Sequence, residues 1–453
     1  MFVLSESARK RGLILAMGCF GGLVNLDETV LGVSLFTIRH DLGLSLTTTH
    51  WIVNSYLLAF TCFAAIGGKA LDLFGLRPAL VVTCLVFAIS SVVAGFSNSA
   101  AMLISMRTIQ GLCAAILFPM ALAATTLTFE EEERGRAIGT LVGMVTVFLA
   151  LGPLVGGVLT QFLSWRWVFW INVPIVLASG FISFLLWREP DREVKRPKVD
   201  LVGLVLLVVG LTSFIFGVVE GPDLGWTSPA VFGTILCGVV GLAAFAIFEL
   251  RHNEPLIDVR LYRFMPFHTG TLIYILTQMS KMIVVIYVPR FLQMELSYSA
   301  LWAGMGTLFA VFPFPFLSAR AGKFADKHGP RTPVVVSLAV LALGNLAIAG
   351  AVILKSVWML VPALLLWGIA LPYAMVPAGL ISTSSVPNEK QGEVSGLVIT
   401  ARLLGSTLGM AMSGLLVAIG AGFASVFVVP AVLIAICSAY GMVALKRKRS
   451  AQV

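Results

Sequence analysis

The sequence predicts an all-α polytopic membrane protein with about fourteen membrane-spanning helices. Of its 453 residues, 58% are hydrophobic and only 12% are charged, whereas soluble domains carry about 25% charged residues. The mean hydropathy of +0.97 is too high for a protein that keeps a polar shell in water. A helix needs about 20 apolar residues to cross the hydrocarbon core, and segments of that length follow one another along the whole chain.

The predicted spans fall into three groups. They cover residues 12–38, 48–70, 77–97, 100–125, 136–161, 166–187, 200–220, 228–249, 267–293, 300–322, 332–353, 356–380, 392–417 and 423–445. Polar links follow the sixth span (188–200) and precede the ninth (249–268). We therefore expect a six-helix bundle over 1–190, a linker with two extra membrane helices over 191–265, and a second six-helix bundle over 266–453.

The distribution of basic residues supports this number of spans. If the N-terminus is cytoplasmic, the cytoplasmic segments hold 24 of the 31 Lys and Arg residues, and the opposite loops hold only Arg39, Arg166, Arg290 and Lys355. Cytoplasmic loops are enriched in basic residues. The sequence thus predicts a multi-pass protein of the bacterial inner membrane with both termini in the cytoplasm. Orientation in the membrane also explains the net charge of +9, so nucleic acid is not an expected partner.

The link between the second and third spans is repeated in the second half of the chain. It contains G-x-x-x-D-x-x-G-x-R, formed by Gly68, Asp72, Gly75 and Arg77, which is a tight turn that displays an acid and a base. AGKFADKHGPRTP, residues 321–333, places the same residue types at the same spacing. Internal repeats of this kind are typical of the two halves of secondary transporters.

The fifth span contains LGPLVGG, residues 151–157. Its small residues Gly152 and Gly156 are four positions apart, with Gly157 beside them, and such spacing lets helices approach closely. Pro153 removes a backbone donor and kinks a helix. We expect this segment to be a packing surface and a hinge.

The remaining motifs are LDETV (26–30), RTIQG (107–111), WRWVFWINVP (165–174) and RLLG (402–405). Together with the repeated link and LGPLVGG, they resemble the major facilitator superfamily, specifically its fourteen-span drug:proton antiporter branch. The resemblance covers nearly the whole chain. It implies export by alternating access, a latch formed by the link after the second span, and an influence of the arginine in RTIQG on proton coupling.

Five charged residues lie well inside the predicted spans, away from the span ends: Asp27, Glu28, Arg107, Lys281 and Arg402. A charge at the centre of a bilayer costs about 2.5–3.5 kcal/mol even on the mildest scale, so each must face a wet cavity or a partner. Burial disfavours a charged carboxylate, and Asp27 can therefore exchange a proton for a substrate. Asp27 and Glu28 lie about 100° apart around their helix, so the sequence does not decide which of them titrates.

Lys281 has no counterpart in the motifs above. Alignment of the two halves places it opposite Thr29, two residues past Asp27, on the first span of the second bundle. We expect Lys281 either to pair with Asp27 or Glu28 or to bind an anionic group of a substrate. The neutral residues expected to bind substrate are Asn54, Tyr56, Gln110, Gln278 and Tyr287.

These observations favour a proton-coupled antiporter that exports small amphipathic compounds. A dedicated exporter of an anionic or zwitterionic metabolite, such as a siderophore or an amino acid, is the alternative that Lys281 suggests, and proton-coupled uptake is a third. The sequence lacks the G-x-x-x-x-G-K-[ST] motif of ATP-driven proteins and any catalytic motif, so an enzyme is not expected. We expect no cofactor or metal, a proton gradient as the energy source, a lipid bilayer and a small molecule as partners, and a monomer.

Overall fold

The computed structural model describes residues 5–67, 74–188, 200–252, 255–329, 331–384 and 391–444, and within these ranges the chain is helical without any β-strand. Thirteen helices there are long and apolar enough to cross a membrane. The other predicted span corresponds to α2, Leu46–Gly67, a helix of 22 residues. The predicted all-α membrane fold is confirmed.

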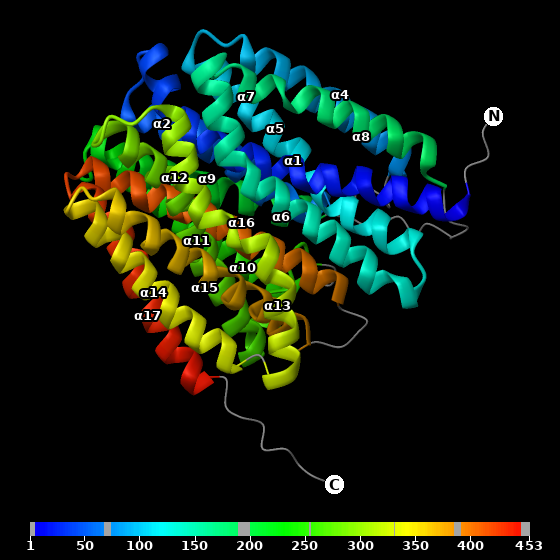
Figure 1. Ribbon diagram of the computed structural model, residues 1–453. Coiled ribbons are helices and arrows are strands. Elements are labelled where there is room, and N and C mark those ends of the chain that lie inside the picture. Colours follow the sequence, from blue (N-terminus) through cyan, green and yellow to red (C-terminus); the bar gives the residue numbers. More distant parts are fainter. Residues whose placement is uncertain are drawn as a thin grey trace.

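The helices form two bundles and an inserted hairpin (Figure 1). The first bundle contains α1 (Glu6–Asp41), α2, α4 (Leu76–Gly95), α5 (Ala100–Thr128), α6 (Glu131–Phe162), α7 (Trp167–Trp170) and α8 (Asn172–Leu186). The hairpin contains α9 (Leu201–Leu224) and α10 (Pro229–Arg251), followed by the 3-10 helix η1 (Val259–Arg263). The second bundle contains α11 (Met265–Met294), α12 (Ala300–Val311), α13 (Pro313–His328), α14 (Arg331–Ile353), α15 (Val357–Ser384), α16 (Gln391–Ala418) and α17 (Gly422–Ala444).

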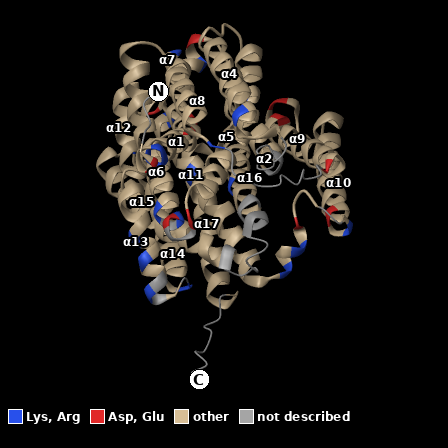
Figure 2. Ribbon diagram, turned by 90° about the vertical axis from the view of Figure 1, so that its right-hand side faces the viewer, with Lys and Arg blue, Asp and Glu red and all other residues tan. Residues whose placement is uncertain are grey.

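Of the thirteen helices that are long and apolar enough to cross a membrane, α1 and α11 are the most enclosed. In the most apolar 18-residue stretch of each helix, 89% of the residues of α1 and 83% of those of α11 are buried inside the protein, against 17% of those of α10. Each is the first helix of its bundle, and the two also contact each other across the interface between the bundles. The charged residues predicted within α1 and α11 are therefore shielded from lipid. Figure 2 shows that most other charged residues lie near helix ends.

The inserted hairpin is attached to both bundles. Its helix α9 packs against α2 of the first bundle and α16 of the second. The carboxylate of Glu220 on α9 accepts a hydrogen bond of 2.6 Å from the Trp51 indole nitrogen on α2. Asp200 caps the start of α9 by accepting from the Gly203 backbone nitrogen at 2.9 Å. The residue boundaries predicted for the three parts of the chain stay a prediction.

The two bundles approach each other closely at one end. Small residues make this possible, since a Cβ added to Gly157 of α6 would lie 2.9 Å from the carbonyl oxygen of Ala300 at the start of α12. Gly304, one turn further along α12, lies directly against the carbonyl of Pro153. Figure 1 shows that the ribbons of the two bundles converge at this end and spread apart towards the end where α1 begins and α17 ends.

Candidate functional site

Asp27 is at the centre of a buried polar cluster within the first bundle. Its side chain, only 1% exposed, accepts hydrogen bonds from the Arg107 guanidinium on α5 and from the Asn172 amide on α8, the latter at 2.9 Å. Arg107 also donates to the side-chain oxygen of Gln110 at 3.0 Å and to the backbone oxygen of Ile52 at 3.3 Å. The carboxylate and the guanidinium therefore satisfy each other away from water, as a buried ion pair requires.

Glu28, the next residue of α1, faces the second bundle. Its Oε1 lies 3.1 Å from the Nζ of Lys281 on α11, and Nζ donates to Oε2 at 3.3 Å. Both side chains are buried, with 7% and 2% of their surfaces exposed. Since successive helical residues point about 100° apart, one acid is held inside its own bundle and the other reaches across the interface. Of the partners predicted for Lys281, the structure selects Glu28 over Asp27.

Arg402 on α16 forms a third polar contact, which is partly buried and again involves α1. Its guanidinium donates a hydrogen bond of 2.9 Å to the amide oxygen of Asn25 on α1 and lies 5.3 Å from the ring centre of Phe118 on α5. Arg402 and Glu28 both interact electrostatically with Lys281, so these charges form one group. We call Asn25, Asp27, Glu28, Arg107, Lys281 and Arg402 the polar centre.

The neutral residues predicted to bind substrate divide into two sets. Gln110 donates to Ser91 at 2.8 Å and Tyr287 contacts His50 at 2.9 Å, so both already have polar partners. The side-chain polar atoms of Asn54, Tyr56 and Gln278 are buried without a hydrogen-bond partner in the part of the chain that the structure describes. A buried polar group without a partner is costly, so these three are better candidates for contact with a bound molecule. Their role in binding stays a prediction.

A second polar group joins the bundles closer to their convergent end. The Nε2 atom of His50 on α2 lies 2.9 Å from the Tyr287 hydroxyl and 3.3 Å from Nη1 of Arg290, both on α11. On the same helix, Gln293 donates 2.9 Å to the backbone oxygen of Val33 on α1. The sequence predicts Tyr287 as a binding residue but places Arg290 in an outer loop, whereas Arg290 is only 5% exposed inside α11.

Sequence reasoning also missed two amides of the polar centre. Asn25 lies two residues before Asp27, and Asn172 belongs to the WRWVFWINVP motif. Both are almost fully buried, at 2% and 0% exposed. The available signal was their polarity within apolar segments, since an amide there needs a partner as much as a charge does.

The structure describes only part of the link that is predicted to act as a latch. Gly68 and Asp72 lie outside the described residues. Gly75 precedes α4 with φ 75° and ψ 159°, a backbone region open essentially only to glycine. Its counterpart in the second half, Gly329, has φ 77° and ψ 153°, so this glycine of the repeated link has the same backbone conformation in both bundles. Arg77 donates 2.9 Å to the backbone oxygen of Trp187 at the end of α8.

The LGPLVGG segment fits between two neighbouring helices. Gly152 lies against the Thr29 side chain of α1, and Gly156 lies against the backbone oxygen of Val30 one residue later. On the other side, Pro153 and Gly157 meet α12, as described above. The glycines thus bring α6 close to the residues that follow Asp27 and Glu28. The role of this segment as a hinge stays a prediction.

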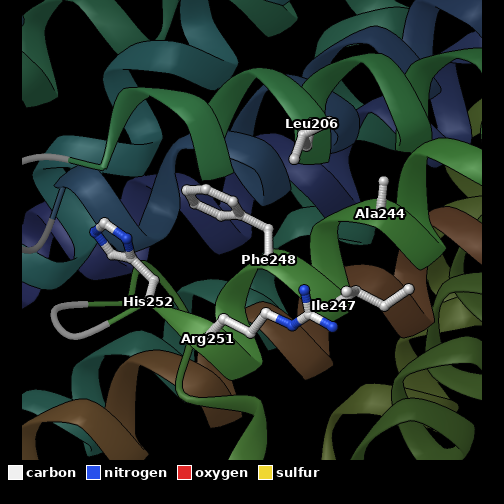
Figure 3. Close-up of a pocket in the computed structure, with 6 residues that line it drawn as sticks. All are labelled: Leu206, Ala244, Ile247, Phe248, Arg251 and His252. Atoms are coloured by element: carbon white, nitrogen blue, oxygen red, sulfur yellow. The ribbon is translucent and has the colours of Figure 1, made fainter.

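A surface hollow between α9 and α10 is separate from the polar centre. It is lined by Leu206, Ala244, Ile247, Phe248, Arg251 and His252 (Figure 3). The His252 ring stacks on Phe248 with 5.1 Å between ring centres. All these residues belong to the inserted hairpin or the residue that follows it, so the hollow does not include the charges described above.

Comparisons with known proteins agree with this architecture. The profile of the Major Facilitator Superfamily matches residues 17–401 and 270–453. The D-xylose–proton symporter shares the fold with a TM-score of 0.70 at 15% identity, covering 95% of this chain and 97% of that one. A transporter of the POT family likewise has a TM-score of 0.70 at 13% identity, covering 96% and 97%.

Three sequence relatives share most of the chain. The tetracenomycin C resistance and export protein of Streptomyces glaucescens is 30% identical over 87% of this chain and 74% of its own. The cephamycin export protein of Amycolatopsis lactamdurans is 33% identical over 88% and 83%, and the multidrug export protein of Haemophilus influenzae is 29% identical over 88% and 79%. The resemblance to drug exporters that the motifs predicted is confirmed. The chain belongs to the major facilitator superfamily.

Proposed function

We propose that this protein is a proton-driven antiporter that exports small amphipathic compounds from the cytoplasm by alternating access. The family and the export relatives support transport as the activity. The observation that carries proton coupling is the pair of adjacent buried acids on α1, one held within its own bundle and the other joined to the opposite bundle. We further propose a monomer in the bacterial inner membrane, with both termini in the cytoplasm and no cofactor.

Glu28 connects protonation to the contact between the bundles. A proton on its carboxylate removes the negative charge that attracts Lys281, and this weakens an ion pair between α1 and α11. Asp27 is the second proton carrier, and Arg107 controls how readily it accepts a proton because the two side chains share a buried ion pair. Each ligand shifts a conformational equilibrium only by its difference in affinity for the two states. The Glu28–Lys281 contact gives the proton such a difference in affinity between the two conformational states.

The arrangement of the bundles suggests which state the structure represents. They are in contact near the start of α12 and diverge where α1 begins (Figure 1). With cytoplasmic termini, the contact between α6 and α12 lies at the outer end of the bundles, and we propose that this end is closed in the structure. Export then requires the contact between α6 and α12 to open while the opposite ends close, with the repeated turns at Gly75 and Gly329 moving as parts of the latch.

The test is transport by inverted membrane vesicles that contain the full-length protein. An imposed gradient with an acidic vesicle interior should drive accumulation of rhodamine 6G or fluorescein, two amphipathic dyes with the same ring system and opposite charge. Addition of the transported dye should release protons from the vesicles, and a protonophore should abolish accumulation. Vesicles without the protein are the control. Accumulation of neither dye, or accumulation that ignores the gradient, would contradict the proposed function.

A further inference from the structure

The polar centre contains more cationic than anionic side chains. Its cations are Arg107, Lys281 and Arg402, and its acids are Asp27 and Glu28. Each acid is already paired, Asp27 with Arg107 and Glu28 with Lys281. Arg402 is therefore left without a carboxylate among the described residues. With all five groups ionised, the polar centre carries a net charge of +1.

The contacts of Arg402 do not neutralise it. Its guanidinium donates to the neutral Asn25 amide at 2.9 Å and faces the Phe118 ring, while its Nε atom is buried and has no hydrogen-bond partner within the described part of the chain. A guanidinium offers five N–H donors in a planar fork that matches an oxyanion. An arginine within a membrane is costly unless it is paired or faces a water-filled path. The unpaired N–H donors of the Arg402 guanidinium therefore indicate a binding site for an anion, which the polar centre itself does not supply.

The polar atoms beside these cations fit the same ligand. Gln278 precedes Lys281 by three residues on α11, and Ser406 follows Arg402 by four on α16, so each pair shares a helix face. The Gln278 amide and the Ser406 hydroxyl are both buried without a hydrogen-bond partner in the described ranges. Together they add neutral donors beside two cations, from two helices of the second bundle.

Arg290 repeats the pattern towards the convergent end of the bundles. Its contacts with the described residues are neutral: His50 at 3.3 Å, the Met294 sulfur at 3.4 Å and the Tyr287 ring at 5.5 Å. Its Nη2 atom is buried and has no partner among the residues that the structure describes. Arg39 repels it electrostatically. A second buried guanidinium without a carboxylate thus lies between the polar centre and the end that must open during export.

We propose that the transported compound is an amphipathic organic anion whose carboxylate, or equivalent oxyanion, binds Arg402 and passes Arg290 on its way out. This inference rests on the proposed function and specifies its substrate class. It moves the expected anion contact from Lys281, which Glu28 occupies, to Arg402. The apolar part of the compound would lie against the surrounding aromatic side chains, of which Phe118 and Tyr56 are closest to the cations.

The charge moved in each cycle distinguishes an anion from a cation. Export of a monovalent anion in exchange for one entering proton transfers a net two positive charges inward, because an anion that leaves is electrically equivalent to a cation that enters. Exchange of a monovalent cation for one proton transfers no net charge. A membrane potential that is positive inside inverted vesicles should therefore accelerate accumulation of an anion and leave that of a cation unchanged.

The experiment compares fluorescein and rhodamine 6G in inverted vesicles, with and without such a potential imposed by potassium and valinomycin, and measures the dye retained on a filter. We expect fluorescein to accumulate, faster with the potential. Arg402→Gln should lower its initial rate at low dye concentration by roughly ten- to a hundredfold, as loss of a charged hydrogen bond does. Arg402→Lys should keep most of the rate, and Arg320→Gln, at an exposed position of α13, should keep all of it.

Two outcomes would overturn this inference and leave the proposed function standing: gradient-driven accumulation of rhodamine 6G alone, or an unchanged fluorescein rate in folded Arg402→Gln. Accumulation of neither dye would overturn both. The comparison of the two dyes in the unmodified protein needs no variant, so it holds even if Arg402→Gln does not fold.

Discussion

At the scale of single residues, two adjacent acids have different surroundings because of the helix that carries them. Asp27 receives hydrogen bonds from Arg107 and Asn172 within one bundle, whereas Glu28 reaches Lys281 in the other. Both are buried, so the paired cation of each offsets the cost of burying a carboxylate. A change at Asp27 should therefore act on the stability of the first bundle, and a change at Glu28 on the contact between the bundles.

The Asp27–Arg107 pair gives a prediction about stability. Arg107→Gln leaves a carboxylate buried without its cation, and breaking a buried pair in this way costs about 3–5 kcal/mol. Asp27→Asn with Arg107→Gln removes both charges and should be less destabilised than Arg107→Gln alone. The measurement is the midpoint of thermal unfolding of each purified variant in detergent. Simple addition of the two single effects would show that the two side chains do not interact.

At the scale of helices, glycines determine where the bundles can touch. Gly157 and Gly304 allow α6 and α12 to approach until backbone meets backbone. On the opposite side of α6, Gly152 and Gly156 pack against α1. One short motif thus connects the helix that carries both acids with the contact that closes one end of the transporter.

Gly304→Val should open that contact. The added side chain would overlap the carbonyl of Pro153, and overpacking of this kind costs about 1–3 kcal/mol. The population with α6 and α12 apart should then rise by roughly tenfold or more. The measurement is the rate at which an impermeant thiol reagent outside intact cells labels Gln293→Cys, a buried position between α11 and α1 at the same end of the bundles. Gly143→Val is the control, because a Cβ there meets open space; equal labelling in both backgrounds would refute the assignment of the contact.

The helices themselves were predictable from sequence, because about 20 consecutive apolar residues can do little else in a bilayer. The basic residues in the loops supported the number and orientation of the spans. The charged residues inside the spans located the polar centre. The partners were not predictable. Helical periodicity shows that Asp27 and Glu28 point in different directions, but only the packing of α1 against α5, α8 and α11 determines what each meets. The amides Asn25 and Asn172 carried no charge to mark them, and Arg290 lies only a turn from the end of its span.

At the scale of the whole molecule, the polar contacts between the bundles lie along one interface. Arg402–Asn25 and Lys281–Glu28 are at the centre, and the His50 group is nearer the convergent end. The hairpin of α9 and α10 spans the same interface from outside, with α9 on α2 and α16. A proton that weakens Lys281–Glu28 therefore acts where the two bundles must move relative to each other.

Proton coupling through Asp27 and Glu28 is tested most directly by separating proton-driven accumulation from simple exchange in proteoliposomes. Glu28→Gln retains a hydrogen-bonding side chain beside Lys281 but cannot exchange a proton. We expect Asp27→Asn combined with Glu28→Gln to exchange labelled for unlabelled dye across the membrane while failing to accumulate dye against its gradient when the pH gradient is imposed. Unchanged gradient-driven accumulation by this double variant would contradict the assignment of proton coupling to the two acids.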